Sequence, residues 1–351
     1  MSPGHRAHSL QGAALPMRPS PISATVDFDA DGVQHGFLKL PVSHDESAWG
    51  AVMIPITVVK NGEGPTALLT GGNHGDEYEG ITALLKLARR LTAEEVQGRV
   101  IIVPMMNQPA AQAGRRTSPM DRGNLNRSFP GDPDGGPTKQ IADYFTRYLV
   151  PMCDYALDLH SGGRTLDILP FAAAHRLDDL ELERRSLKGA IDFGASTAIM
   201  MYELDAAALY DTVVENQGKV LVTTELGGGG TSTPASIEIS ERGVHNFLIF
   251  AGITKGDIQR PPRQQYVEMP DASCYVQSEH TGLLEMTCAL GGLVRKGEVV
   301  ARLWDITRTG AEPVEYRAER DGLVLARRFP ARVDMGDTIV VIGEVVKTLE
   351  R

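Results

Sequence analysis

The sequence predicts an α/β fold followed by a smaller C-terminal all-β domain. Through the first ~260 residues, apolar runs of strand length alternate with segments whose apolar residues recur at helical spacing. After the linker RPPRQQYVEMP, the pattern changes to short β-rich runs with regular turns. Hydrophobic residues make up 42% of the 351 residues, so the chain can bury a sizeable core. We therefore expect a disordered leader at residues 1–25, an α/β domain at 26–260 and a small β domain at 265–351.

The α/β domain begins with strands and a clear strand–helix–strand unit. Residues 28–59 contain GFLKLPV and VMIPITVV, which favour short strands with turns. TALLTGG is an apolar run of strand length that ends in glycines. The next segment, ITALLKLARRLTAEEV, has apolar residues on one helical face, and GRVIIVPMMN is a further buried strand. Residues 66–106 are therefore typical of an α/β sheet.

The remaining elements of this domain follow a long irregular loop. Residues 107–137 are rich in Gly, Pro, Asn and Arg, and loops of this length are usually functional or disordered. A helix is expected over residues 138–150, and YALDLH is the next strand. The alternation then continues with LPFAAA, the charged helix DDLELERRSLKGAIDFGA, the strand KVLVTTELGGGG and the helical stretch ASIEISERGVHNFLIFAGI.

Two segments of the C-terminal domain echo each other: GGLVRKGEVVARLWD and PARVDMGDTIVVIGE. Each has an apolar pair, a charged turn that ends in Gly and a β-rich run. The repeat predicts a small β-sandwich similar to biotinyl and lipoyl domains. The lysine that such carriers modify is absent, because the intervening ERDGLVLAR has no Lys at its turn. This favours a domain that shapes the site or the oligomer over a swinging-arm carrier.

Charge and cysteine usage exclude several classes of protein. The chain has 35 Lys plus Arg against 45 Asp plus Glu, and its net charge of -10 argues against a nucleic-acid binder. Cys153, Cys274 and Cys288 are far apart and outside a CxxC pattern, so we expect reduced thiols in a cytoplasmic protein rather than a zinc site. The chain has neither an apolar run of membrane-spanning length nor the apolar segment of a secretory signal, so no membrane partner is expected.

Two strand ends carry residues that can bind a metal ion. His74 and Glu77, in GGNHGDEYEG, lie between a strand and a helix at a spacing that lets both face one ion. His160 ends the apolar strand YALDLH and precedes Ser-Gly-Gly, a position that core packing explains poorly. In open α/β sheets, the ligand crevice lies outside the carboxyl ends of the strands. The three residues therefore form a candidate His₂Glu zinc site with an open fourth position.

Two further acidic residues belong to the same strand ends. Asp158 lies two residues before His160 and could orient a ligand imidazole, the alternative being an ordinary strand-end charge. Glu225 ends the strand VLVTTE, where an isolated carboxylate is costly unless it is used or solvated. We expect Glu225 to be the general base for a zinc-activated water, and a solvent-facing strand end is the alternative.

The long loop supplies positive charge. NLNRSFPG contains Asn126 and Arg127 between apolar neighbours, and three more arginines lie upstream. Because Arg pairs carboxylates bidentately, one of these residues would hold a substrate carboxylate and another would stabilise a developing oxyanion. A solvated basic loop is the alternative. The upstream arginines are Arg115, Arg116 and Arg122.

In order along the chain, GGNHGDEYEG, NLNRSFPG, DLHSGG and TTELGGGG resemble the four motifs of the succinylglutamate desuccinylase/aspartoacylase family. These are zinc amidohydrolases related in fold to the metallocarboxypeptidases, and the resemblance covers roughly residues 50–255. It implies one zinc ion per subunit, bound by His74, Glu77 and His160, with Glu225 as the base.

The same resemblance implies roles for the loop. Asn126 and Arg127 would grip the substrate carboxylate, and Arg116 would polarise the scissile carbonyl. The loop length leaves Arg115 and Arg122 as alternatives for that second role. Asn124 stands where the family commonly has Asp.

Residues 27–80 look like the ectoine-degradation branch of this family, the Nα-acetyl-L-2,4-diaminobutyrate deacetylases. The branch implies release of acetate from an Nα-acetyl amino acid, an acidic pocket residue for the cationic side chain, and a homo-oligomer. Alternatives within enzymes are N-acetylaspartate, succinylglutamate or a peptide C-terminus as substrate. A metal-free binding or carrier protein is the alternative from a different class.

Overall fold

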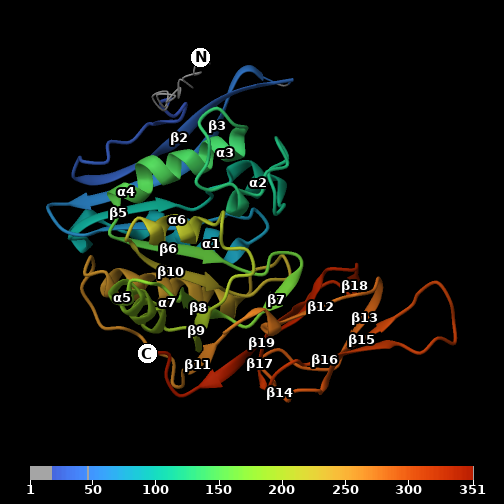
Figure 1. The fold of residues 1–351 in the computed structure, drawn as a ribbon. Helices are drawn as coiled ribbons and strands as arrows, with labels where there is room; N and C mark the ends of the chain where they lie inside the picture. The colour runs from blue at the N-terminus through green and yellow to red at the C-terminus, as the bar shows by residue number, and fades with distance from the viewer. Residues whose placement is uncertain (1–17, 46, 351) are drawn as a thin grey trace, which may run out of the picture.

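In the described residues of the computed structural model, fifteen strands join in one long mixed sheet and four form a second sheet (Figure 1). The structure describes residues 18–45 and 47–350. Most of the predicted leader, residues 1–17, lies outside this part of the chain, and Ser23–Ala24 forms strand β1. A mixed α/β sheet followed by a separate antiparallel C-terminal sheet confirms the coarse fold class that the sequence predicts.

A long antiparallel pair of strands forms the N-terminal edge of the large sheet. Strand β2 (Gly32–His44) pairs with β3 (Ser47–Asn61) over nearly its whole length, and β1 pairs with β2. The prediction of several short strands here is wrong. Buried side chains such as Leu38 and Leu40 alternate with exposed ones along β2, so the interrupting polar residues are the outer face of one strand, not turns.

Four parallel strands form the centre of the sheet, in the order β5-β4-β6-β10. Strand β3 lies antiparallel beside β5. Because these four strands run in the same direction, their carboxyl ends meet at one edge, as the sequence predicts. Their bounds are β4 (Thr66–Gly71), β5 (Gly98–Val103), β6 (Tyr155–His160) and β10 (Val220–Glu225).

The sheet continues beyond β10 into the C-terminal part of the chain. Strand β8 (Phe171–His175) is antiparallel to β10, and β9 (Thr197–Met201) and β11 (Gln265–Glu268) follow it in parallel. Strand β19 (Thr338–Val346) then pairs with β11. Hydrogen-bonded pairing therefore crosses the predicted boundary near residue 265, and the division into domains at 26–260 and 265–351 stays a prediction.

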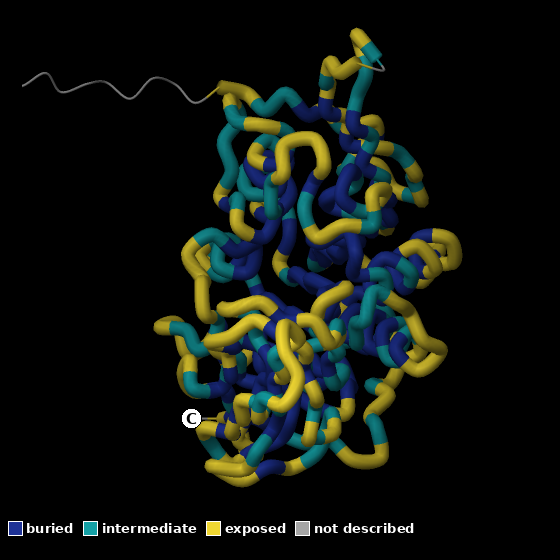
Figure 2. Tube along the Cα trace, turned by 90° about the vertical axis from the view of Figure 1, so that its right-hand side faces the viewer, coloured by how far each residue is buried: buried dark blue, intermediate teal, exposed yellow. Residues whose placement is uncertain are grey.

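Helices cover both faces of the central strands. On one face, α1, α5 and α7 pack through buried side chains such as Leu84, Phe193 and Phe247. On the other, α3, α4 and α6 pack through residues such as Ile141 and Tyr210. Figure 2 shows buried segments gathered in the interior of the molecule, with exposed segments mostly at its outside. The bounds are α1 (Tyr78–Arg90), α3 (Pro137–Tyr144), α4 (Val150–Met152), α5 (Leu180–Phe193), α6 (Tyr210–Asn216) and α7 (Pro234–Phe250).

The ends of the long helices have clear local causes. Asp179 caps α5 by accepting hydrogen bonds from the backbone N–H groups of Glu181 and Leu182, and Gly194 ends it in the left-handed conformation. Thr233 caps α7, with Pro at its first position. None of the helices in residues 18–45 and 47–350 is long and apolar enough to cross a bilayer.

Each copy of the C-terminal repeat contains two strands, one in the large sheet and one in the small sheet. In the first copy, β14 joins the large sheet and β15 the small one; in the second copy, β18 joins the small sheet and β19 the large one. Buried residues such as Val300, Val324 and Ile339 form a core of their own between them. The remaining bounds are β7 (Leu166–Ile168), β12 (Tyr275–Gln277), β13 (Gly282–Met286), β14 (Leu293–Val294), β15 (Val299–Trp304), β16 (Val314–Arg317), β17 (Gly322–Arg328) and β18 (Arg332–Val333).

The long loop after β5 is more regular than its composition indicates. It contains the short helix α2 (Gln108–Ala113) and a helical turn at Leu125–Arg127. The helix predicted over residues 138–150 is confirmed: α3, a π-helical turn at Phe145–Leu149 and α4 follow one another without a break. Cys153, Cys274 and Cys288 are unpaired.

Candidate active site

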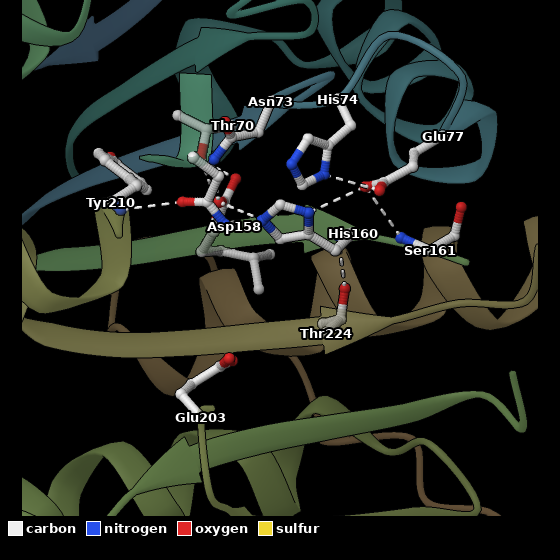
Figure 3. A network of polar contacts seen from close by, with 12 residues as sticks. Thr70, Asn73, His74, Glu77, Asp158, His160, Ser161, Glu203, Tyr210 and Thr224 are labelled. Atoms are coloured by element: carbon white, nitrogen blue, oxygen red, sulfur yellow. Dashed lines mark hydrogen bonds and ion pairs between the residues drawn. The ribbon is translucent and has the colours of Figure 1, made fainter. Parts of the chain in front are cut away.

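The three predicted metal ligands lie together at the carboxyl edge of the parallel strands. His74 follows β4, Glu77 is the residue before the first turn of α1, and His160 ends β6. Their ligand atoms all lie within 4.8 Å of one another, and all three side chains are buried. Each carboxylate oxygen of Glu77 contacts one histidine: Oε1 lies 2.7 Å from His74 Nδ1, and Oε2 lies 2.9 Å from His160 Nδ1 (Figure 3).

The second nitrogen of each imidazole has its own partner. His160 Nε2 lies 2.8 Å from Oδ2 of Asp158. Oδ2 also accepts a hydrogen bond from Asn73, and Oδ1 accepts one from Thr70. His74 Nε2 lies 3.2 Å from Oδ1 of Asn124. If each Nε2 donates to its oxygen partner, each Nδ1 offers a lone pair on the Glu77 side. Asp158 thus lies beside the His160 ring, as the sequence predicts. Asn124, which replaces the Asp common in the family, lies beside the His74 ring.

Electrostatics favour a charged carboxylate at the centre of this cluster. Burial alone would raise the pKa of Glu77, but His74 and His160 hold it well below its ordinary value. Burial lowers the pKa of His74. Burial also opposes protonation of His160, but Asp158 and Glu77 raise its pKa above the ordinary value. Two imidazoles and one carboxylate are the donors of hydrolytic zinc sites, so these residues fit a zinc ion.

Glu225 lies beside the cluster, on the same face of the sheet as His160. The two residues pair directly between β10 and β6, and paired residues of neighbouring strands project from the same face. Oε2 of Glu225 is buried and has no hydrogen-bond partner among the described residues. Burial, followed by the charge of Glu77, raises the pKa of Glu225 to about 8. A carboxylate in this position can accept and release a proton near neutral pH.

The structure separates the three candidate arginines of the loop. Nη1 of Arg116 lies 3.2 Å from His74 Nδ1 and 3.3 Å from Glu77 Oε1. Arg115 and Arg122 do not line the cavity above the cluster. Arg116 is therefore the arginine that the fold brings to the ligands.

Asn126 and Arg127 also line this cavity, which has a volume of about 350 Å³. Oδ1 of Asn126 accepts a hydrogen bond from the backbone N–H of Tyr210, which leaves its amide nitrogen for other partners. Arg127 forms an ion pair with Asp205 at 3.3 Å. All of the predicted site residues therefore surround one cavity: His74, Glu77, Arg116, Asn126, Arg127, His160 and Glu225.

Comparison with protein families identifies the part of the chain that carries the predicted site residues. Residues 63–251 match the model of the succinylglutamate desuccinylase/aspartoacylase catalytic domain. The chain belongs to the succinylglutamate desuccinylase/aspartoacylase family. The matched range contains each of the predicted site residues, so the resemblance of the four motifs is confirmed at the level of the family.

Full-length relatives of this family support the same conclusion. Over 333 residues the chain is 74% identical to the N-alpha-acetyl-L-2,4-diaminobutyric acid deacetylase of Halomonas elongata, which covers 95% of this chain and 97% of that protein. A product-bound structure of the ectoine utilization protein EutE (DoeB) from Ruegeria pomeroyi is 56% identical, with a TM-score of 0.91, and covers 93% of this chain and 100% of that one. A succinylglutamate desuccinylase structure from Silicibacter sp. TM1040 is 55% identical, with a TM-score of 0.91, and covers 94% of this chain and all of that one.

The cavity of this family member also contains residues that the sequence does not predict. Glu203 lies in the loop after β9, Asp211 lies in the first turn of α6, and Arg328 ends β17 in the C-terminal part. Tyr275 and Thr338 also line it from that part of the chain. None of these residues belongs to one of the four sequence motifs. They reach the cavity only through the packing of segments that are far apart in the sequence. For the two acidic residues, the sequence offers one indication: a substrate with a cationic side chain requires an acidic partner in the cavity.

Proposed function

We propose that this chain is a zinc-dependent amide hydrolase that removes the acetyl group from Nα-acetyl-L-2,4-diaminobutyrate. The observation that carries this proposal is the 74% identity, over 95% of the chain, to a deacetylase of that substrate. The clustered ligand atoms of His74, Glu77 and His160 support the zinc dependence. The match to an ectoine utilization protein supports a place in ectoine breakdown.

His74, Glu77 and His160 would hold the zinc ion, one per subunit. Bound there, zinc would supply Lewis-acid chemistry, polarising the amide carbonyl and making a water molecule more acidic. Asp158 and Asn124 would keep the two imidazole rings oriented, because each lies within hydrogen-bond distance of the Nε2 atom.

Glu225 would move the proton. Oε2 of Glu225 would take a proton from water as the water oxygen attacks the acetyl carbon. When the carbon–nitrogen bond breaks, the same carboxyl would deliver that proton to the departing amine. The second proton of the water leaves the new carboxyl group for the amine, so the products are acetate and the amino acid with a protonated amine, and atoms and charge balance. The raised pKa of Glu225 and its buried, unpartnered oxygen support this role.

Three residues of the long loop would position the substrate. Asn126 and Arg127 would bind its α-carboxylate, since both line the cavity and a guanidinium pairs bidentately with a carboxylate. Arg116 would stabilise negative charge on the carbonyl oxygen, because it lies within 3.3 Å of the ligand cluster.

The finer fold, the location and the oligomeric state belong to the same proposal. We propose that the mixed sheet is that of the metallocarboxypeptidases and that the C-terminal unit, which encloses its own core, is barrel-sandwich-like. We further propose a cytoplasmic homo-oligomer with a catalytic domain at residues 26–260 and a β domain at 265–351. Sedimentation of the purified protein tests the oligomer, and cell fractionation tests the location.

A substrate panel with and without metal tests the activity. The panel contains Nα-acetyl-L-2,4-diaminobutyrate, N-acetylaspartate, succinylglutamate and a peptide with a free C-terminus. We expect the first to be hydrolysed fastest, chelation to abolish the activity and added zinc to restore it. Full activity in metal-free protein would contradict the mechanism. Faster turnover of N-acetylaspartate or succinylglutamate would favour the alternative, a deacylase for acidic acyl amino acids.

A further inference from the structure

Two carboxylates in the cavity have no role in the proposed hydrolysis. Glu203 and Asp211 both line the same space as the ligands and Glu225. Glu203 lies on the loop between β9 and α6, and in Figure 3 its side chain points toward β10. Asp211 lies in the first turn of α6, directly after Tyr210. The two residues come from neighbouring segments but reach the cavity independently of the ligand motifs.

Asp211 is buried in a way that requires a partner. Asp211 is 3% exposed, and its Oδ1 atom has no hydrogen-bond partner among the described residues. Burial, followed by the charge of Asp158, raises the pKa of Asp211 to about 7. A buried carboxylate is costly unless it is hydrogen-bonded or paired with a cation. An unpartnered acidic side chain that lines a substrate cavity therefore indicates a ligand that brings positive charge.

Among the described residues, His175 is the cation that pairs with carboxylates of this corner, and the charge of His160 in the ligand cluster also acts on Asp211. His175 ends β8; its Nδ1 lies 2.9 Å from Glu215 and its Nε2 lies 4.0 Å from Glu203. Burial opposes the charge on His175, but the hydrogen bond to Glu215 and the charges of Glu215, Asp211 and Glu203 raise its pKa to about 9. One imidazolium thus faces three carboxylates, and an excess of negative charge is left at the cavity wall.

The arginines that line the cavity do not cancel this excess. Arg127 pairs with Asp205, and Arg328 pairs with Asp337 at 3.0 Å; neither acid lines the cavity. Arg116 pairs with Glu77 in the ligand cluster. The cavity is therefore polarised: its arginines pair with acids outside this corner, and the acidic corner is available for a cation.

We propose that Glu203 and Asp211 bind the side-chain ammonium group of the acyl amino acid, and that they select basic substrates over neutral and acidic ones. The proposal rests on the deacylase function proposed above. An ammonium group is a compact charge with three donors, so it can satisfy two carboxylates at once. A substrate with an acidic side chain would place a further negative charge in the same corner and be repelled, so the corner would discriminate against N-acetylaspartate.

The test compares two substrates of nearly equal shape, Nα-acetyl-L-2,4-diaminobutyrate and Nα-acetyl-L-norvaline, in which a methyl group replaces the ammonium. The variants are Glu203→Gln and Asp211→Asn, and the matched control is Glu312→Gln on an exposed loop. We expect each site variant to lower kcat/KM for the charged substrate by roughly 10- to 100-fold, with that for norvaline nearly unchanged. The control should leave both values at the wild-type level.

Each outcome distinguishes the subsite from the reaction itself. If wild-type protein cleaves neither substrate, the proposed function fails. If wild-type protein cleaves the charged substrate and both variants keep its full preference over norvaline, only the subsite is wrong. An equal loss on both substrates would assign a merely structural role to these residues. Glu203 lies in a loop and its side chain is 22% exposed, so Glu203→Gln provides the test even if Asp211→Asn does not fold.

Discussion

Glu77 is the residue on which the candidate centre depends, because both histidines face its carboxylate. Ser161 also donates its backbone N–H to the Oε2 atom of Glu77 at 3.3 Å. The pairs His160–Asp158 and His74–Asn124 differ in charge, since one partner is a carboxylate and the other a neutral amide. This difference follows from a single residue, Asn124, and makes the two rings electronically unequal as candidate metal ligands.

Replacement of Glu225 by Gln tests the proton transfer at the residue scale. Gln has nearly the same shape as Glu but cannot accept the proton of water. We expect Glu225→Gln to lower kcat by roughly 10²- to 10⁴-fold, with KM and zinc content close to wild type. Steady-state kinetics and metal analysis of the same preparation provide the measurement. Near-normal turnover with zinc bound would show that another group acts as the base.

The partly buried His175 makes stability depend on pH. Its pKa is about 9 in the folded protein against an ordinary value of 6.5, so its protonated form stabilises the fold. The stabilisation is fully present below pH 6.5, declines above it and is lost as the pH rises through 9. Because a tenfold change in proton affinity is worth about 1.4 kcal/mol, the contribution is on the order of 3 kcal/mol.

Urea unfolding of wild-type protein and His175→Gln between pH 6 and pH 10 measures this effect. We expect the difference in unfolding free energy between the two proteins to be largest near pH 6 and to narrow toward pH 10. The charged groups that face His175 are Glu203, Asp211 and Glu215. A difference that does not change with pH would mean that His175 stays neutral in the folded protein.

At the scale of elements, the close contact between α1 and β6 positions the candidate metal ligands Glu77 and His160. A Cβ atom at Gly80 would lie 2.5 Å from the Cβ of Leu159 and 3.0 Å from its carbonyl oxygen. Glycine therefore lets the helix that follows Glu77 pack directly on the residue before His160. The motif GGNHGDEYEG thus contains a packing requirement as well as two predicted metal ligands.

Gly80→Ala tests this packing. We expect it to lower the free energy of unfolding by about 1–3 kcal/mol, because the helix must move away from β6. The movement should also weaken zinc binding, because it separates Glu77 from His160. Leu85→Ala, on the exposed face of the same helix, is the matched control and should change stability by less than about 0.5 kcal/mol. Unchanged urea unfolding of Gly80→Ala would contradict the close contact.

At the scale of the whole molecule, the C-terminal strands are packed into the α/β part. Ile168, Phe171 and Ile199 share one buried cluster with Leu325 and Val341 of the C-terminal strands. Strand β17 also pairs with β7, and β19 pairs with β11. The C-terminal part therefore covers a face of the sheet and supplies Arg328 and Thr338 to the cavity.

This shared core leads us to expect one cooperative unfolding transition. A Trp49→Phe variant leaves Trp304 of the small sheet as the only tryptophan, so its fluorescence reports the C-terminal part and far-UV circular dichroism the whole chain. The two midpoints should coincide in urea. Leu325→Ala should shift both together, with a loss of about 2–5 kcal/mol, whereas Ile306→Ala on the exposed surface should shift neither. Two separate midpoints would support independently folding domains.

By itself the sequence determined the residue types of the centre and the strands that carry them. His74, His160 and Glu225 follow apolar runs, and the carboxyl ends of parallel strands meet at one edge, so local pattern was enough to bring these side chains together. It also determined the alternation of strands and helices and the C-terminal repeat. It did not determine the length of β2 and β3, because alternation along an outer strand is easily taken for turns.

Only the tertiary structure decided which of the three arginines reaches the ligands and which acids form the cavity wall. Arg116, Glu203 and Asp211 lie on loops or at helix starts, where no periodic pattern reports the direction of a side chain. Arg328 comes from a strand that joins the large sheet far along the chain. Such contacts depend on how distant segments pack, and the polarity of the cavity is therefore a property of the folded molecule.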